Sequence, residues 1–189
     1  MSRAPGSIRI IGGRWRGTRL AVPDSPGLRP SGDRVRETLF NWLMPKLPGA
    51  RVLDLFAGTG ALGLEAVSRG AAQATLVERA PALAANLRAS VAKLRAQDCV
   101  QVAQADALAW LPQQADGSFD IAFIDPPFAQ GSWQPALAAV LPKLAADAWI
   151  HVESAADAVP EPPLGWALHR EGRTREVRYA LYRAATGHG

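Results

Sequence analysis

The stretch at residues 119–128, FDIAFIDPPF, is the clearest candidate for chemistry, because a strand-like apolar run ends there in an acid, two prolines and an aromatic ring. Pro126 and Pro127 have no N–H to donate, so the carboxylate of Asp125 and the nearby carbonyls lack matching donors. Phe128 adds a flat apolar face. The stretch favours a slot for a flat group that carries N–H donors, and a rigid Asp-Pro turn is the alternative interpretation.

A glycine-rich turn follows an earlier strand-like run. In DLFAGTGALG, Gly58, Gly60 and Gly63 fit the pattern G-x-G-x-x-G, and Glu78 lies 20 residues after Gly58, at the end of the next predicted strand. This spacing matches the dinucleotide fingerprint, in which a tight turn brings backbone close to the ligand and a carboxylate binds ribose hydroxyls. A nicotinamide-dependent dehydrogenase is therefore one candidate.

Two further carboxylates favour S-adenosylmethionine instead. Asp54 lies four residues before Gly58, where its charge suits an ammonium or sulfonium group and opposes a pyrophosphate. Asp106, in QADAL, follows the next predicted strand, where it can accept from an adenine amino group. Strand-end or helix-cap roles remain open for Asp54, Glu78 and Asp106. All of these acids, however, stand at the carboxyl ends of strands, where open α/β sheets bind ligands.

The elements that must position these residues alternate between strand-like and helix-like from residue 52 onward, which predicts βαβ units and a parallel sheet. The predicted strands span residues 52–56, 74–78, 100–104, 119–124 and 148–153, and the predicted helices span 81–95, 106–111 and 134–144. Hairpins are expected at 8–11 with 18–22 and at 166–170 with 176–182. A helix begins within RPSGDRVRETLFNWL, with Ser31 or Asp33 as its cap.

Charge is concentrated at one end of the chain. Residues 1–36 contain eight arginines and two aspartates, a balance of +6, whereas the remaining residues carry −2. This clustering indicates a polyanionic partner such as nucleic acid. No run approaches a membrane span, and no secretory signal is visible, so we expect a cytoplasmic protein. The single cysteine and the three scattered histidines predict no disulfide and no metal site.

Taken together, VLDLFAGTG, LVERA, QADAL and IDPPF resemble the successive motifs of class I S-adenosylmethionine-dependent methyltransferases. Residues 8–43 are similar to the opening of the bacterial RsmD family, the 16S ribosomal RNA guanine-N2 methyltransferases, and the likeness is weakest after Val152. It implies a Rossmann-like α/β fold with a mostly parallel seven-stranded sheet, a C-terminal antiparallel hairpin and a small N-terminal β-hairpin extension. Residues 1–30 would form the RNA-contacting extension and residues 31–189 the methyltransferase domain.

The resemblance also implies an activity. It is methyl transfer from S-adenosylmethionine to N2 of one guanine, conventionally numbered 966, in the 16S rRNA of the assembling or assembled 30S subunit. The product would be S-adenosyl-L-homocysteine and the protein a monomer. A DNA adenine-N6 methyltransferase shares the DPPF motif and is the alternative, beside the dehydrogenase. A non-enzymatic RNA-binding protein would explain only the basic N-terminal region.

Carried over residue by residue, the resemblance implies three groups of site residues. The catalytic slot comprises Asp125, Pro126, Pro127 and Phe128. The cofactor site comprises Asp54, Phe56 (where many class I enzymes have glycine), Gly58, Gly60, Glu78, Arg79, Asp106 and Ala107. RNA would be bound by Arg9, Arg14, Trp15, Arg16, Arg29, Arg34 and Arg36. Trp15 has the alternative role of anchoring the hairpin. Arg34 and Arg36, near a helix start, have the alternative role of serving the active site or pairing with Glu37.

Overall fold

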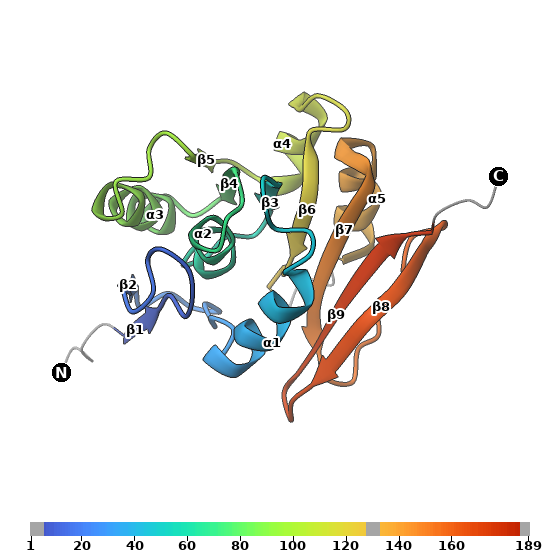
Figure 1. The fold of residues 1–189 in the computed structure, drawn as a ribbon, viewed down its shortest axis with the longest axis horizontal. Helices are drawn as coiled ribbons and strands as arrows, with labels where there is room; N and C mark the ends of the chain where they lie inside the picture. Colours follow the sequence, from blue (N-terminus) through green and yellow to red (C-terminus); the bar gives the residue numbers. More distant parts are fainter. Residues whose placement is uncertain (1–5, 128–132, 186–189) are drawn as a thin grey trace.

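Seven strands form one sheet with helices on both faces (Figure 1), in a computed structural model that describes residues 6–127 and 133–185. The strand order is β5-β4-β3-β6-β7-β9-β8, with β9 antiparallel to both of its neighbours and the other pairs parallel. The strands are β3 (Arg51–Asp54), β4 (Gln73–Glu78), β5 (Val100–Gln104), β6 (Phe119–Ile124), β7 (Leu144–Ala155), β8 (Trp166–Arg173) and β9 (Val177–Ala184). The predicted fold class is confirmed.

Two apolar layers cover the sheet, and this explains why the central strands read as continuous apolar runs. Successive residues of a strand point to opposite faces, so Val52 joins one buried cluster and Leu53 the other. The first cluster includes side chains of α1 (Asp33–Leu43), α2 (Ala61–Ser68) and α3 (Pro81–Lys93). The second includes side chains of α4 (Ala107–Trp110), the 3₁₀ turn η1 (Leu111–Gln113) and α5 (Trp133–Val140).

Two local predictions were wrong. The helix expected to reach residue 144 ends at Val140, because Pro142 cannot continue it; the 3₁₀ turn η3 (Leu141–Lys143) follows and β7 begins at Leu144. The N-cap of α1 is Gly32 and makes no side-chain cap hydrogen bond. Ser31 instead donates to a carboxylate on β7, described below with the cleft.

A buried carboxylate joins the N-terminal hairpin, β1 (Gly6–Arg9) and β2 (Arg19–Val22), to the rest of the protein. Glu65 of α2 is 0% exposed. It accepts from the backbone N–H groups of Ile11 and Gly12 at 2.8–3.2 Å, and from Nε of Arg69 at 2.8 Å. Nη1 of Arg36 lies 3.4 Å from Oε2. One side chain therefore fixes the loop after β1 against α1 and α2.

Arg36 is part of this interior network, which corrects the prediction that it contacts RNA. Its side chain is 1% exposed, and it donates to the carbonyls of Arg9 and Ser31 and to the carboxylate of Asp33 at 2.7–3.1 Å. Burial lowers the pKa of Arg36, opposed by Glu65 and Asp33. The pairing with Glu37 considered from the sequence was also wrong, since its acidic partners are Asp33 and Glu65. The prediction had followed the clustering of arginines, which carries no information about burial.

No helix in the described parts of the chain is both long and apolar enough to cross a membrane.

Replacing Glu65 with alanine should destabilise the protein strongly, because Arg36 would keep its buried charge and lose that acceptor. We expect a loss of about 3–5 kcal/mol in the free energy of unfolding, measured by urea titration. Asp147→Ala is the control: Asp147 is 80% exposed and pairs with Lys46 at 2.7 Å, so its loss should change stability by less than about 1 kcal/mol. Similar urea midpoints for the two variants would contradict the structural role of Glu65.

His151 of β7 should make the protein sensitive to acid. Its ring is fully buried, neither nitrogen has a hydrogen-bond partner among the described residues, and burial lowers its pKa from 6.5 to about 3. Between those values the unfolded chain binds a proton that the folded chain does not, so this residue makes stability fall as pH decreases. Between pH 7 and pH 5, the melting temperature of His151→Leu should decrease by less than that of the wild type. Parallel pH profiles would contradict this.

Candidate active site

A cleft of about 980 Å³ lies at the carboxyl ends of the parallel strands. Five acidic residues line it: Asp54 and Glu78 end β3 and β4, Asp106 and Asp125 follow β5 and β6, and Glu153 lies near the end of β7. The loop of residues 25–32 and the β8–β9 turn complete the lining. This is the edge at which open α/β sheets bind ligands, and here it is strongly acidic.

The glycine turn after β3 brings Asp54 against the start of α2. Gly60 is the N-cap of α2 with φ of 77°, a left-handed conformation that glycine adopts without strain. Gly63, in the first turn of the helix, donates its N–H to Oδ2 of Asp54 at 3.0 Å, and a Cβ there would collide with Leu76 of β4. Because a carboxylate occupies this helix end, a pyrophosphate would meet negative charge instead of a free amide. This arrangement opposes the dinucleotide interpretation.

Two further carboxylates are held in place by backbone N–H groups. Glu78 accepts from Gly58 at 3.0 Å through Oε2 and from Ala80 at 2.8 Å through Oε1. Asp106 is the N-cap of α4, and its Oδ1 accepts from Leu108 and Ala109 at 3.0 and 3.1 Å. The capping interpretation of Asp106 is therefore confirmed. A carboxylate oxygen has more than one lone pair, so neither side chain loses its capacity to accept from a ligand in the cleft.

Burial makes two acids of the cleft, Asp54 and Asp125, difficult to ionise. The Asp54 side chain is 2% exposed, and burial raises its pKa to about 7, with the Gly63 hydrogen bond opposing and Glu78 adding to the shift. Burial also raises the pKa of Asp125 well above its usual value, with further increases from Glu153 and Asp54. Carboxyl groups in this state gain their charge most readily beside a bound cation. The cleft is therefore suited to a positively charged ligand.

The slot after β6 has a second acid that the sequence interpretation missed. Ile124 pairs with Val152 in parallel register, and the residues that follow them, Asp125 and Glu153, are close enough for Glu153 to raise the pKa of Asp125. Glu153 is 4% exposed and accepts from the hydroxyl of Ser31 at 2.6 Å. The sequence contained a signal for this acid: Glu153 is the last residue of the predicted strand 148–153, just as Glu78 is the last residue of the predicted strand 74–78.

The structure brings most of the predicted site residues together. Of the cofactor residues, Asp54, Phe56, Gly58, Glu78, Arg79, Asp106 and Ala107 line the cleft, whereas Gly60 shapes the turn behind it. Asp125, Pro126 and Pro127 also line it, and Phe128 lies outside the described residues. Their chemical roles remain predictions.

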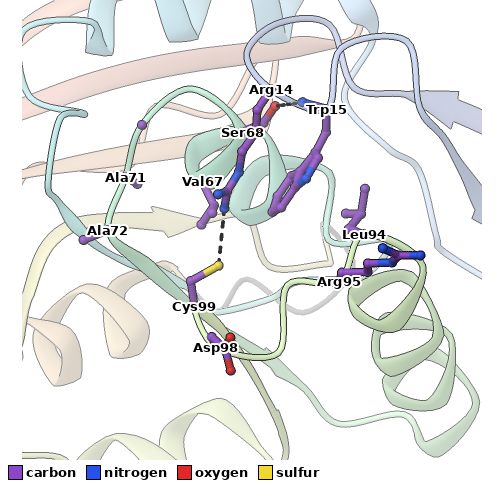
Figure 2. Close-up of a pocket in the computed structure, with 11 residues that line it drawn as sticks. Arg14, Trp15, Val67, Ser68, Ala71, Ala72, Leu94, Arg95, Asp98 and Cys99 are labelled. Carbon is purple, nitrogen blue, oxygen red and sulfur yellow. Dashed lines mark hydrogen bonds between the residues drawn. The ribbon is translucent and has the colours of Figure 1, made fainter.

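Two predicted RNA-binding residues lie at the opposite end of the sheet. Figure 2 shows Arg14 extending toward Cys99, which precedes β5, with the Trp15 ring directed toward Leu94. Nη2 of Arg14 lies 3.4 Å from Sγ of Cys99, and its guanidinium stands 4.4 Å from the Trp15 ring centre. The Trp15 side chain packs against the first apolar cluster, and the backbone N–H of Trp15 donates to Ser68 Oγ at 3.0 Å. These contacts support the anchoring role of Trp15.

The remaining predicted RNA-binding arginines are exposed. Arg29 lines the cleft and lies 3.5 Å from Glu176 across its rim, and Arg9 pairs with Asp33 at 3.1 Å. Arg16 and Arg34 are also exposed. The strand β4, six residues or roughly 20 Å long, separates the Arg14 region from the cleft. An RNA that contacted both would have to extend along the length of the sheet.

Several proteins that resemble this chain in sequence are named as methyltransferases. The family described as Conserved hypothetical protein 95 matches residues 8–183. Ribosomal RNA small subunit methyltransferase D of Escherichia coli K12 is 48% identical over 180 residues, which cover 94% of this chain and 90% of the relative. The protein of the same name from Haemophilus influenzae is 41% identical over 183 residues, covering 95% of each chain.

The fold agrees with these relatives. The solved structure of the Escherichia coli methyltransferase yhhF superposes with a TM-score of 0.85 at 45% identity, covering 95% of this chain and 98% of that one. The agreement extends over both the N-terminal hairpin and the sheet, because nearly the whole of each chain is matched. The chain therefore belongs to the RsmD family of methyltransferases.

Proposed function

We propose that this protein transfers a methyl group from S-adenosylmethionine to the exocyclic N2 of a guanine in 16S rRNA, the guanine conventionally numbered 966. The substrate is the RNA of the assembling or assembled small ribosomal subunit. The observation that carries the proposal is the acidic cleft in which Asp125 stands at the end of β6 beside a second carboxylate. The names of the Escherichia coli and Haemophilus influenzae relatives support the choice of ribosomal RNA.

The cleft residues fit S-adenosylmethionine, which when bound supplies an electrophilic methyl group on sulfonium. Asp54 lies at the glycine turn, where its carboxylate would stabilise the positive methionine end of the cofactor. Glu78, already oriented by Gly58, would accept from the ribose hydroxyls. Asp106 and Ala107 would lie against the adenine ring.

The residues of the slot after β6 would prepare the N2 amine of guanine to attack the methyl group. The lone pair of the guanine N2 is delocalised into the ring, which makes the amine a poor nucleophile. Asp125 and the carbonyl of Pro126 would each accept one N–H, favouring a tetrahedral nitrogen whose lone pair points away from both acceptors. Alignment of this kind supplies most of the rate enhancement in a direct displacement of the methyl group from sulfonium. The nitrogen can lose its proton after the methyl group has been transferred.

The base has to leave its stack to reach the slot, as in other base-modifying enzymes. Phe128 would stack on the extruded guanine, a contact worth roughly 1–3 kcal/mol. The exposed arginines Arg9, Arg16, Arg29 and Arg34 would bind phosphates of the RNA, and of these Arg29 lines the cleft. Their contribution would weaken as the salt concentration rises.

Asp125→Ala should abolish transfer while leaving the cofactor site intact. We expect methyl incorporation into small-subunit particles to fall at least about 100-fold, because one acceptor of the amine is lost. The dissociation constant for S-adenosylhomocysteine, measured by calorimetry, should change by less than about threefold, since it has no sulfonium charge for Asp125 to stabilise. Asp116→Asn is the matched control: Asp116 is 77% exposed and pairs with Lys143 outside the cleft.

Two outcomes would overturn parts of this proposal. Parallel losses of cofactor affinity and activity in Asp125→Ala would refute its assigned role. Transfer to adenine in duplex DNA, with none to ribosomal RNA, would refute the proposed substrate.

Binding of S-adenosylmethionine should strengthen as pH rises through 7. Asp54 has a pKa of about 7, so below that value it is largely protonated, and the cofactor cation favours the ionised form. Affinity should rise by up to about tenfold per pH unit between pH 6 and 7 and level off above pH 8. Calorimetry in buffers of different ionisation enthalpy should show proton release, reduced in Asp54→Asn. Equal affinity at pH 6 and pH 8 would contradict this linkage.

A further inference from the structure

Glu153 is a buried acid of the cleft that the proposed mechanism leaves unused. We propose that Glu153 accepts the N1–H of the target guanine and so selects guanine over other bases that carry an exocyclic amine. This inference rests on the proposed function and deepens it, because it identifies how the slot recognises its substrate.

The sheet places Glu153 next to the residue that would hold the amine. Neighbouring parallel strands in register direct paired side chains to the same face, about 4.8 Å apart. Ile124, the last residue of β6, pairs with Val152, and Asp125 and Glu153 are the residues that follow them. Both line the cleft, and Glu153 is close enough to Asp125 to raise the pKa of that carboxyl. Two acceptors therefore lie near each other where β6 ends beside β7.

The orientation of Glu153 is fixed from two directions. Its Oε2 accepts from the hydroxyl of Ser31 at 2.6 Å, and its backbone carbonyl accepts from the indole N–H of Trp133 at 3.0 Å. Oε1 takes no hydrogen bond from a residue within 6–127 or 133–185, and it is not among the fully buried unpaired atoms of those residues, so it is open to the cleft. A ligand N–H in the cleft can therefore donate to Oε1.

Guanine has the matching pattern of donors. Its Watson–Crick edge carries N1–H directly beside the N2 amine, so the amine can lie against Asp125 while N1–H meets Glu153. Adenine and cytosine carry an amine beside a ring nitrogen that has a lone pair and no proton. That lone pair would face the Glu153 carboxylate and be repelled. Recognition would combine an attractive contact with guanine and a repulsive one with the other two bases.

The charge state of the pair is consistent with this role. Burial raises the pKa of Glu153, opposed by the Ser31 hydrogen bond. Asp54, Asp125 and Glu153 all face the same cleft, together with Glu78 and Asp106 on one side and Arg29, Arg79 and Glu176 at its rim. The carbonyl oxygen of a protonated Glu153 would still accept from N1–H, and a bound sulfonium favours the ionised form.

The test uses small subunits reconstituted with 16S RNA that carries either guanine or 2-aminopurine at the target position. 2-Aminopurine keeps the reactive amine but presents N1 as an acceptor. With the wild type, we expect methyl transfer to guanine to be roughly 10- to 100-fold faster in kcat/KM. In Glu153→Gln the side-chain amide can donate to N1, so the guanine preference should shrink at least about tenfold.

Asp116→Asn, outside the cleft, should retain the wild-type preference, and S-adenosylhomocysteine affinity checks that each variant is folded. A Glu153→Gln protein that keeps the wild-type preference would overturn the inference. So would equal wild-type rates on the two RNAs, even if the variant did not fold. Absence of wild-type transfer to guanine RNA would instead overturn the proposed function itself.

Discussion

The buried carboxylate of Glu65 is the interaction on which the shape of the cleft depends. It ties together the N-terminal loop, α1 and α2, and its partner Arg36 also binds the carbonyls of Arg9 and Ser31. The loop of residues 25–32 is therefore held at its C-terminal end by an interior ion network. This loop lines the cleft and carries the Ser31 hydroxyl that donates to Glu153. The Glu65–Arg36 ion pair, which lies outside the cleft, therefore helps to position Glu153 inside it.

The cleft itself repeats one arrangement along neighbouring strands. On three of these strands an acid is held by a donor from another element: Gly63 for Asp54, Gly58 for Glu78 and Ser31 for Glu153. Side chains fixed in this way need little reorganisation when a ligand binds, which is the condition under which electrostatic stabilisation is most effective. Acids held in fixed positions favour cations and N–H donors together, which is what the proposed reaction requires.

Much of this site could be predicted because its signals are local. The glycine turn and the acids at strand ends lie within a few residues of the strands that position them. The Glu65–Arg36 pair could not be predicted, because the two residues are 29 positions apart and meet only after α1 packs on α2. Glu153 was overlooked for a related reason, since its partner Ser31 is 122 positions away. The arginine cluster predicted a basic region but not which member is buried.

The order of the last three strands has a consequence for synthesis of the chain. β9 lies between β7 and β8 although it is translated after both, and β8 pairs with β9 among the described strands. Until Val177–Ala184 has emerged, β8 has no place in the sheet, and the turn bearing Thr174 and Glu176 cannot close the rim of the cleft. A nascent chain that has already folded its first five sheet strands thus holds Asp54, Glu78, Asp106, Asp125 and Glu153 but not the wall that faces Arg29. That wall is therefore the last part of the cleft to form.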